Sequence, residues 1–143
     1  MVTYNKPIFQ DFNIEQVMHI SPSEANDVLK NNEAILIDVR EQDEILTENI
    51  PLENVLYHPM SVILDRLAYI AKDQHIILGC PAGIRSTKVA NLMILNGYPH
   101  VANLDGGFNE WKQQGFPYEA NMSLGIGCGC DVPPEKSSDP KCC

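Results

Sequence analysis

The sequence predicts an α/β protein whose central parallel sheet of about five strands is flanked by helices on both faces. Short apolar runs alternate with segments of helical periodicity through most of the chain, which is the pattern of consecutive βαβ units. The run at residues 34–38 is uninterrupted by polar side chains and ends in a carboxylate, as expected of a strand buried on both faces.

Length and composition limit the range of functions. The 143 residues and the hydrophobic content of 44% suit one compact domain with its own core. The formal net charge of −9 argues against a nucleic-acid partner, which would require a basic patch. No apolar run approaches the roughly 20 residues of a membrane span, and residues 1–7 lack the features of a signal peptide. We therefore expect a cytoplasmic protein without a membrane partner.

The first half of the chain is expected to begin with an N-terminal extension at residues 1–13, which show no period. A short strand at residues 15–20 is followed by a helix start in which Ser21 caps, Pro22 fits the first turn and Glu24 completes a capping box. Further elements are expected in this order: a strand at 34–38, a short helix at 41–47, a strand at 54–57 and a helix at 61–71.

The second half repeats the alternation. The elements expected there are a strand at 75–78, a helix at 85–96 stopped by Gly97, a strand at 101–104, a turn capped by Asp105, and a helix that carries Trp111 and ends by Gly115 and Pro117. The main domain is therefore expected to span residues 14–120. Gly, Pro and Ser dominate thereafter, which predicts a cysteine-rich tail at residues 121–143.

Cys80 is the main candidate for chemistry. It lies between the strand at 75–78 and the helix at 85–96, so its thiol is expected at a helix N-terminus, where unpaired N–H groups favour the thiolate. Gly83 lets the intervening loop adopt backbone angles that gather several N–H groups around one anion or charged sulfur. The alternative is a buried cysteine with a structural role only.

Four blocks of sequence resemble the rhodanese domain, a sulfurtransferase module. The strand-end segment 36–41 contains Asp-Val-Arg, Ile50-Pro51 matches the centre of a second block, and residues 80–86 resemble the active-site loop. Residues 103–107, with Trp111, Gly115 and Pro117 after them, resemble the C-terminal signature. The second block departs from the family pattern, because Asn49 and Leu52 stand where the family usually has His and Gly.

The resemblance implies a sulfurtransferase that moves a sulfane sulfur through a persulfide on Cys80. The donor would be thiosulfate or a persulfide, the acceptor would be cyanide or a thiol, including a protein thiol, and no cofactor would be required. The substrate-binding residues implied are Pro81, Ala82, Gly83, Ile84, Arg85 and Ser86. Asp38 and Arg40 would support the site, and a cap or a mutual ion pair is favoured for them over direct catalysis.

The length of the loop distinguishes sulfur from phosphate as cargo. Four residues separate Cys80 from Arg85, whereas cysteine phosphatases, including those on the same scaffold, resemble Cys-x5-Arg. The tighter loop better suits a single sulfur atom on the thiol than a phosphate or arsenate group.

The tail holds four further thiols, namely Cys128, Cys130, Cys142 and Cys143. Four thiolates can close a tetrahedral zinc site or bind copper(I), although the spacing is not a standard zinc pattern. A second sulfur relay from Cys80, a reversible disulfide and no specific role are the alternatives. For the whole chain, a persulfide carrier module or a metal-binding or redox protein based on the tail are therefore alternatives to the enzyme.

Overall fold

The computed structural model describes residues 1–120. The chain divides into two compact units, which are described separately. Of the described residues, the first unit contains 1–41 and 51–117, and the second contains 42–50 and 118–120. The candidate site lies in the first unit.

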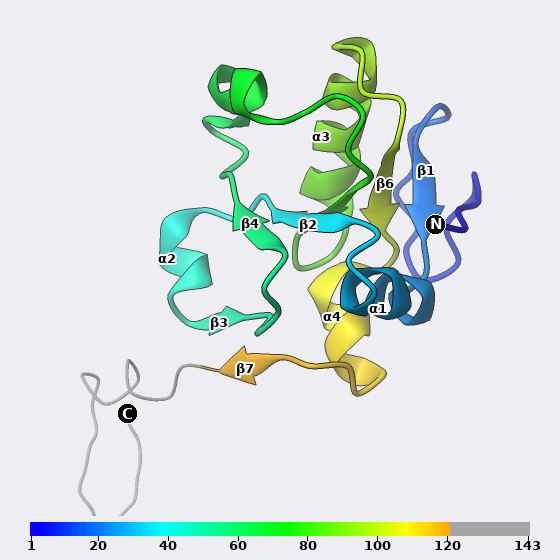
Figure 1. Ribbon diagram of the computed structural model, residues 1–143. Helices are drawn as coiled ribbons and strands as arrows, with labels where there is room; N and C mark the ends of the chain where they lie inside the picture. The colour runs from blue at the N-terminus through cyan, green and yellow to red at the C-terminus, as the bar shows by residue number, and fades with distance from the viewer. Residues whose placement is uncertain (121–143) are drawn as a thin grey trace, which may run out of the picture. The chain divides into compact units, whose positions relative to one another are not determined.

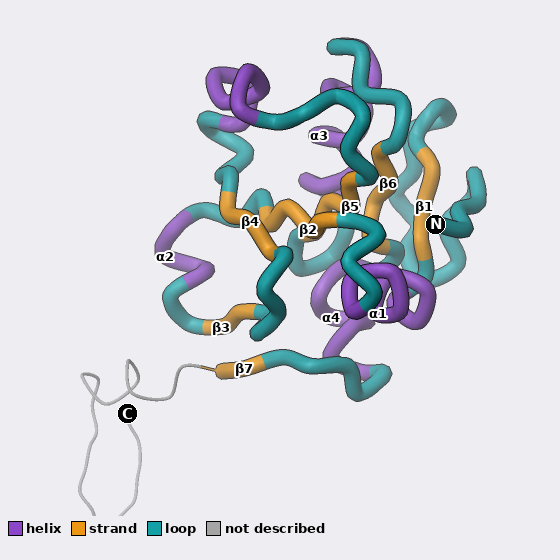
Figure 2. Tube along the Cα trace, viewed as in Figure 1, coloured by secondary structure: helices purple, strands orange, loops and turns teal. Residues whose placement is uncertain are grey.

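A five-stranded, wholly parallel sheet forms the centre of the first unit, so the expected fold class is confirmed (Figures 1 and 2). Its strands are β1 (Met18–Ile20), β2 (Ile35–Asp38), β4 (Val55–Tyr57), β5 (Ile76–Gly79) and β6 (Val101–Leu104). They lie in the order β1-β6-β5-β2-β4, with β5 in the centre. In this register Leu78 pairs with Ile37 on one side and with Asn103 on the other. Because all strands run the same way, their carboxyl ends share one edge.

Three α-helices and one 3₁₀ helix surround this sheet, namely α1 (Pro22–Lys30), η1 (Ile63–Tyr69), α3 (Ile84–Leu95) and α4 (Gly107–Gln113). The start of α1 follows the expected chemistry, since the Ser21 hydroxyl accepts the N–H of Glu24 at 3.1 Å. The other half of the predicted capping box differs, because the Glu24 carboxylate accepts the N–H of Val2 at 3.0 Å.

Alternate side chains of the central strands face two apolar layers. Ile37, Leu78 and Val101 belong to a buried cluster that also contains residues of η1 and α3. Gly79 points to the opposite layer, where a Cβ atom would meet the ring of Phe108 at 2.6 Å and Leu36 at 3.5 Å. Helices therefore cover both faces of the sheet, and α4 approaches the central strand closely because Gly79 has no side chain.

The segment at 61–71 was expected to be a helix, and the structure has a shorter helix there whose type the sequence pattern did not specify. The structure has the 3₁₀ helix η1 at Ile63–Tyr69, which begins without a side-chain cap and is buried only at Ile63. An apolar pattern that anchors a segment at few points does not require the full α-helical hydrogen-bond ladder, and short 3₁₀ turns satisfy it equally well.

The second unit contains the helix α2 (Gln42–Ile45) and the strands β3 (Glu48–Asn49) and β7 (Glu119–Ala120), which pair antiparallel. The helix lies within the segment expected at 41–47. The two short strands were not predicted, because two-residue strands carry no period that a sequence pattern could reveal.

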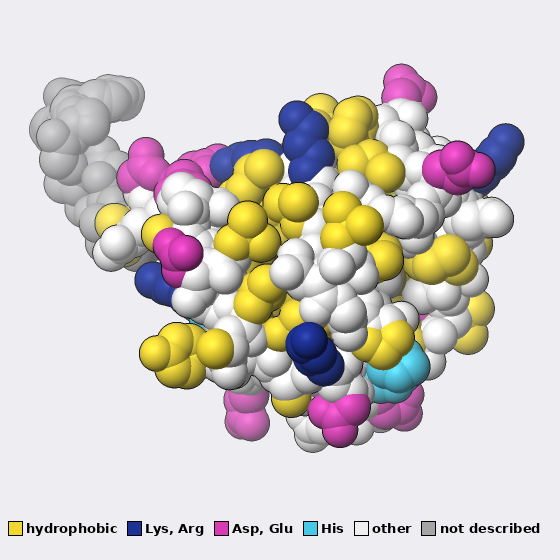
Figure 3. Space-filling model, turned by 90° about the horizontal axis from the view of Figure 1, so that it is seen from above, with side chains coloured by type: hydrophobic (Ala, Val, Ile, Leu, Met, Phe, Trp, Pro, Cys, Tyr) yellow, Lys and Arg dark blue, Asp and Glu magenta, His cyan; other side chains and the backbone are white. Residues whose placement is uncertain are grey.

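The end of the first unit that bears η1 exposes apolar side chains, including Leu64 and Tyr69. Figure 3 looks onto this end and shows hydrophobic side chains gathered there, with acidic side chains mainly towards the edge. Within residues 1–120, no helix is long and apolar enough to cross a membrane.

Gly107 allows a test of how tightly α4 is packed against the loop that follows β5. Its φ of +67° is unfavourable for other residues, and a Cβ atom would lie 2.3 Å from the carbonyl oxygen of Cys80. Gly115 has a similar φ of +84°, but a Cβ atom there would meet nothing within 4 Å, so it serves as the matched control. We expect Gly115→Ala to lower the free energy of unfolding by about 1–2 kcal/mol, and Gly107→Ala to lower it clearly more. Urea denaturation measures both, and equal losses would contradict the tight packing.

Candidate active site

The loop that follows β5 surrounds the sulfur of Cys80 with hydrogen-bond donors. The N–H groups of Gly83 and Ser86 donate to Cys80 Sγ at 3.1 and 3.3 Å, and the Ser86 hydroxyl lies 3.3 Å from it. Gly83 has a φ of +84°, which turns the loop into the first turn of α3. Cys80 is only 1% exposed, so these donors act on a sulfur that is largely shielded from water. Such an arrangement stabilises negative charge on sulfur.

The six residues predicted to bind substrate differ in burial and in their contact with Cys80 Sγ. Gly83 and Ser86 are buried and contact Sγ, whereas Ala82 and Ile84 are exposed on the outer side of the loop. Pro81 and Arg85 are half-buried. The loop thus has an inner side that holds the sulfur and an outer side that is open to other molecules.

The start of α4 holds the loop from behind. The N–H of Phe108 donates to the carbonyl oxygen of Cys80 at 2.9 Å, and the N–H of Asn109 donates to that of Pro81 at 3.0 Å. These N–H groups belong to the first turn of a helix and have no partner within it. The contact therefore satisfies both the helix end and the loop.

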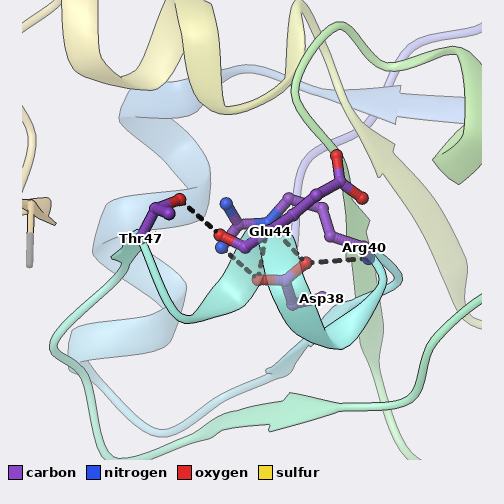
Figure 4. Close-up of polar contacts among 4 residues, drawn as sticks. All are labelled: Asp38, Arg40, Glu44 and Thr47. Carbon is purple, nitrogen blue, oxygen red and sulfur yellow. Dashed lines mark hydrogen bonds and ion pairs between the residues drawn. The ribbon is translucent and has the colours of Figure 1, made fainter. Parts of the chain in front are cut away.

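Asp38 and Arg40 form the ion pair that was considered for them. Arg40 Nη2 lies 2.7 Å from Asp38 Oδ2, both side chains are buried, and Figure 4 shows the carboxylate facing the guanidinium. The Arg40 guanidinium also lies over the Phe108 ring, 4.9 Å from its centroid. Through Phe108 the pair is linked to the Cys80 carbonyl, which suits a supporting role.

Asp105 was expected to cap the turn before the next helix, but the hydrogen bonds that its side chain accepts come from the N-terminal segment. Its carboxylate accepts the Tyr4 hydroxyl at 2.7 Å and the N–H groups of Ile8 and Phe9 at 2.7 and 3.1 Å. The residue in the N-cap position of α4 is Gly106, which adopts a φ of +78°. Burial, followed by the hydrogen bond to Asp105, raises the pKa of Tyr4 above its ordinary value.

A chain of polar side chains extends from Cys80 into the interior. The Ser86 hydroxyl donates to Asn103 Oδ1 at 2.5 Å, and Asn103 Nδ2 lies 3.0 Å from Gln10 Oε1 and 3.1 Å from His19 Nδ1. His19 Nε2 lies 2.7 Å from Asn13 Oδ1. Ser86, Asn103 and His19 are completely buried. Sequence analysis did not single out Gln10 or Asn103 for a role of this kind, since no motif marks a polar contact between distant segments.

A cavity of about 440 Å³ lies beside the outer side of the loop. It is lined by residues 9–12 of the N-terminal segment, by Ala82 and Ile84 of the loop, and by α4. Of the described residues that line it, the charged ones are Asp11 and Glu110. The cavity is thus partly apolar and its charge is negative.

The model of the rhodanese-like domain family matches residues 21–114. The chain belongs to this family. A protein named sulfurtransferase from Allochromatium vinosum is 34% identical over 88 residues, which cover 62% of this chain and 80% of the relative. Thiosulfate sulfurtransferase GlpE from Coxiella burnetii is 30% identical over 109 residues, which cover 76% of this chain and 97% of GlpE.

Solved structures agree on the rhodanese-like fold. The solution structure of the rhodanese-like domain from the Anabaena sp. Alr3790 protein has a TM-score of 0.67 and 21% identity, and the match covers 84% of this chain and 92% of that one. The part of the present chain matched by the family model includes Cys80, Ser86 and Asn103, but Gln10, Asn13 and His19 precede it.

The four tail cysteines, Cys128, Cys130, Cys142 and Cys143, lie outside the described residues. Their binding of zinc or copper(I) stays a prediction. Within residues 1–120, no group of three or more His, Cys, Asp or Glu side chains is placed to hold a metal ion.

The buried state of His19 allows a test by pH. Burial lowers the pKa of His19, although the nearby Asp105 carboxylate opposes this shift. Below the ordinary histidine pKa of 6.5, the unfolded chain binds a proton at this position before the folded chain does, so the free energy of unfolding falls as the pH falls. Between about pH 7.5 and about pH 5.5, we expect the free energy of unfolding of His19→Gln to fall less steeply than that of the unsubstituted protein.

His58 provides the comparison, because burial and then Arg66 lower its pKa as well. His58→Gln should also flatten the decline while leaving the contacts of Asn103 intact. Urea denaturation at several pH values measures the effect, and an unchanged slope in His19→Gln would contradict the assignment of a buried, neutral His19.

Proposed function

We propose that this protein is a sulfurtransferase that carries a sulfane sulfur on Cys80. The proposal rests above all on the placement of Cys80 Sγ at the N-terminus of α3, within hydrogen-bond distance of the N–H groups of Gly83 and Ser86. Membership of the rhodanese-like domain family and the names of the two relatives support it. The short loop between Cys80 and Arg85 favours a sulfur atom over a phosphate group as cargo.

The reaction takes place in two displacements. In the first, the Cys80 thiolate attacks the outer sulfur of a donor such as thiosulfate, the S–S bond of the donor breaks, and sulfite leaves with the bonding electrons. In the second, an acceptor thiolate attacks the outer sulfur of the Cys80 persulfide, which forms an acceptor persulfide and restores the Cys80 thiolate. Cyanide as acceptor yields thiocyanate in the same way. Neither step involves a metal or a redox cofactor.

The loop acts on the charged sulfur in both steps. The N–H groups of Gly83 and Ser86 stabilise the thiolate before the first step and as the leaving group of the second. The hydrogen bonds from Phe108 and Asn109 to the loop carbonyls keep these donors in place, so little reorganisation is needed as charge moves between the two sulfur atoms.

The cavity beside the loop is where we place the rest of the substrate. Phe9 and Phe12 provide apolar surface, and the Asp11 and Glu110 carboxylates provide negative charge. Such a wall repels sulfite-like groups and favours neutral or positively charged thiols and persulfides, in keeping with the net charge of −9. A low-molecular-weight or protein persulfide is therefore favoured over thiosulfate as the natural donor.

The first test is the mass of the intact protein after treatment with thiosulfate and, separately, with a low-molecular-weight persulfide. We expect a gain of one sulfur atom that maps to the Cys80 peptide, and loss of this gain on addition of cyanide. Cys80→Ser should lose both the gain and steady-state sulfur transfer, because a serine oxygen cannot form the persulfide. Undiminished turnover in Cys80→Ser would contradict the proposal.

The same experiment separates the alternatives. A sulfur that loads onto Cys80 but leaves only to one protein partner would indicate a carrier module. A gain that maps to Cys128, Cys130, Cys142 or Cys143 would implicate the tail as a relay. Metal analysis of protein purified without chelators tests the prediction of zinc or copper(I) at these four cysteines.

The second test varies the charge of the acceptor. Cysteamine, 2-mercaptoethanol and 3-mercaptopropionate are similar in size but carry a positive charge, no charge and a negative charge. With rates corrected for thiolate concentration, we expect kcat/KM to fall in that order. Glu110→Gln should reduce the ratio of kcat/KM between cysteamine and 3-mercaptopropionate by about two- to threefold.

The control is Glu33→Gln, which changes the net charge equally at an exposed position before β2, near the amino ends of the strands. It should leave the order and range of kcat/KM unchanged. Equal effects of the two substitutions would mean that overall charge, and not the cavity, selects the acceptor.

A further inference from the structure

The orientation of the Gln10 amide is determined by its backbone partners. Gln10 Nε2 donates to the carbonyl oxygens of Phe12 and Gly83 at 2.8 and 3.2 Å, and carbonyl oxygens can only accept. Gln10 Oε1 accepts the N–H of Gly106 at 2.9 Å. Both ends of the amide are thus assigned, and Oε1 is the atom that faces Asn103.

The orientation of the Gln10 amide determines the orientation of the Asn103 amide, which in turn determines the tautomer of His19. Because Gln10 Oε1 is an acceptor, the atom of Asn103 that faces it must be the donor Nδ2. The second hydrogen of Nδ2 donates to His19 Nδ1, so this nitrogen carries no proton. The proton of the neutral ring is on Nε2 and is donated to Asn13 Oδ1. Asn103 Oδ1 is left facing Ser86, and as an acceptor it requires the Ser86 hydroxyl to donate.

The Ser86 hydroxyl has one proton and two neighbours that can accept it. Ser86 Oγ donates to Asn103 Oδ1 at 2.5 Å, and Cys80 Sγ lies 3.3 Å from Ser86 Oγ. While Cys80 is a thiol, its S–H can donate to Ser86 Oγ and every group in the chain is satisfied. When this proton is lost to solvent, the thiolate faces oxygen lone pairs unless the hydroxyl turns towards it and leaves Asn103 Oδ1 without a donor.

We propose that Asn103 is a positioning residue that competes with Cys80 for the single Ser86 proton, so that the orientation of its amide sets how readily Cys80 becomes the thiolate. The inference rests on the proposed function only in that the thiolate is the form that accepts the sulfane sulfur. It assigns to Asn103, and through it to Gln10, a role that none of the motifs contains. A buried acceptor without a donor costs about 1–3 kcal/mol, which is large enough to decide between the two hydroxyl positions.

Charged and titratable groups surround this chain on several elements. On the elements that carry these side chains or pack beside them, these groups are His19 on β1, Asp38 at the end of β2, Arg40 after β2, Arg85 and Lys88 on α3, and Asp105 after β6. Asp38 and Arg40 neutralise each other, and the Asp105 carboxylate accepts three hydrogen bonds from the N-terminal segment. Asn103→Leu removes none of these charged groups, but it removes the donor that His19 Nδ1 accepts, so the double variant described below is needed to separate an effect on the Ser86 proton from an effect through His19.

The test is the pH profile of Cys80 alkylation by iodoacetamide in the full chain, with modification of the Cys80 peptide quantified by mass spectrometry. Asn103→Leu removes the competing acceptor at nearly constant volume and frees the hydroxyl for sulfur. We expect the midpoint of the profile to move to lower pH by about 0.5 to 1 unit. Ser86→Ala removes the hydroxyl for which Asn103 and Cys80 compete, and it provides the background for the double variant.

The double variant Ser86→Ala/Asn103→Leu distinguishes competition from a general disturbance of the core. Without the Ser86 hydroxyl there is nothing to compete for, so Asn103→Leu should add no further shift in this background. Three outcomes would each overturn the proposal. The alkylation midpoint could shift equally on Asn103→Leu with and without the Ser86 hydroxyl, it could fail to shift in Asn103→Leu alone, or it could move to higher pH in that variant.

Gln10→Met provides a second route if Asn103→Leu fails to fold. It leaves Asn103 and Ser86 in place but removes the acceptor that holds the Asn103 amide, so the amide can turn its Nδ2 towards Ser86. We expect a shift to lower pH that is smaller than in Asn103→Leu, and an unchanged midpoint would contradict the proposal. Alkylation involves no sulfur transfer. These results would therefore stand even if Cys80→Ser kept its sulfurtransferase activity and the proposed function were overturned.

Discussion

The carbonyl groups of Cys80 and Pro81 are the point on which the geometry of the site depends. They accept the first N–H groups of α4, those of Phe108 and Asn109, and this approach is close enough that Gly107 must lack a side chain. With its carbonyls held from behind, the loop turns its own N–H groups inward onto Cys80 Sγ. A loop that lacked this contact would have to satisfy both sets of polar groups with water, and the sulfur would lose its fixed donors.

A second layer of contacts comes from the N-terminal segment, which precedes the part of the chain matched by the family model. Asp105 fixes the backbone at Ile8 and Phe9, and Gln10 joins the loop at Gly83 to the end of β6 at Asn103. The same segment supplies one wall of the cavity. It follows that the part of the site shared with the family holds the sulfur, while the segment outside that match shapes what can approach it.

The sequence was sufficient to predict the parallel sheet and the position of Cys80 at its carboxyl edge, because period and turn residues determine these features, and it offered the pairing of Asp38 with Arg40 as one of two structural roles. It was not sufficient for η1, whose apolar pattern fits an α-helix and a 3₁₀ helix alike. It also assigned Asp105 to the cap of the turn before the next helix, because aspartate side chains commonly hydrogen-bond to nearby backbone groups in turns. The actual partners, Tyr4 and Ile8, are separated from it by more than ninety residues, and such contacts leave no local pattern.

The groups found against Cys80 Sγ include two backbone N–H donors and the Ser86 hydroxyl, which are neutral dipoles at hydrogen-bond distance in a buried site. Their effect on the sulfur is short in range and little screened by salt. The Asp11 and Glu110 carboxylates, by contrast, line the open cavity and would act on a proposed substrate while it still has its solvent shell. Formation of the thiolate should therefore be insensitive to ionic strength, whereas the approach of an anionic donor should be faster at high salt. On the proposed function, the interior would control the reactivity of the nucleophile, and the outer wall of the cavity would control which sulfur compound reaches it.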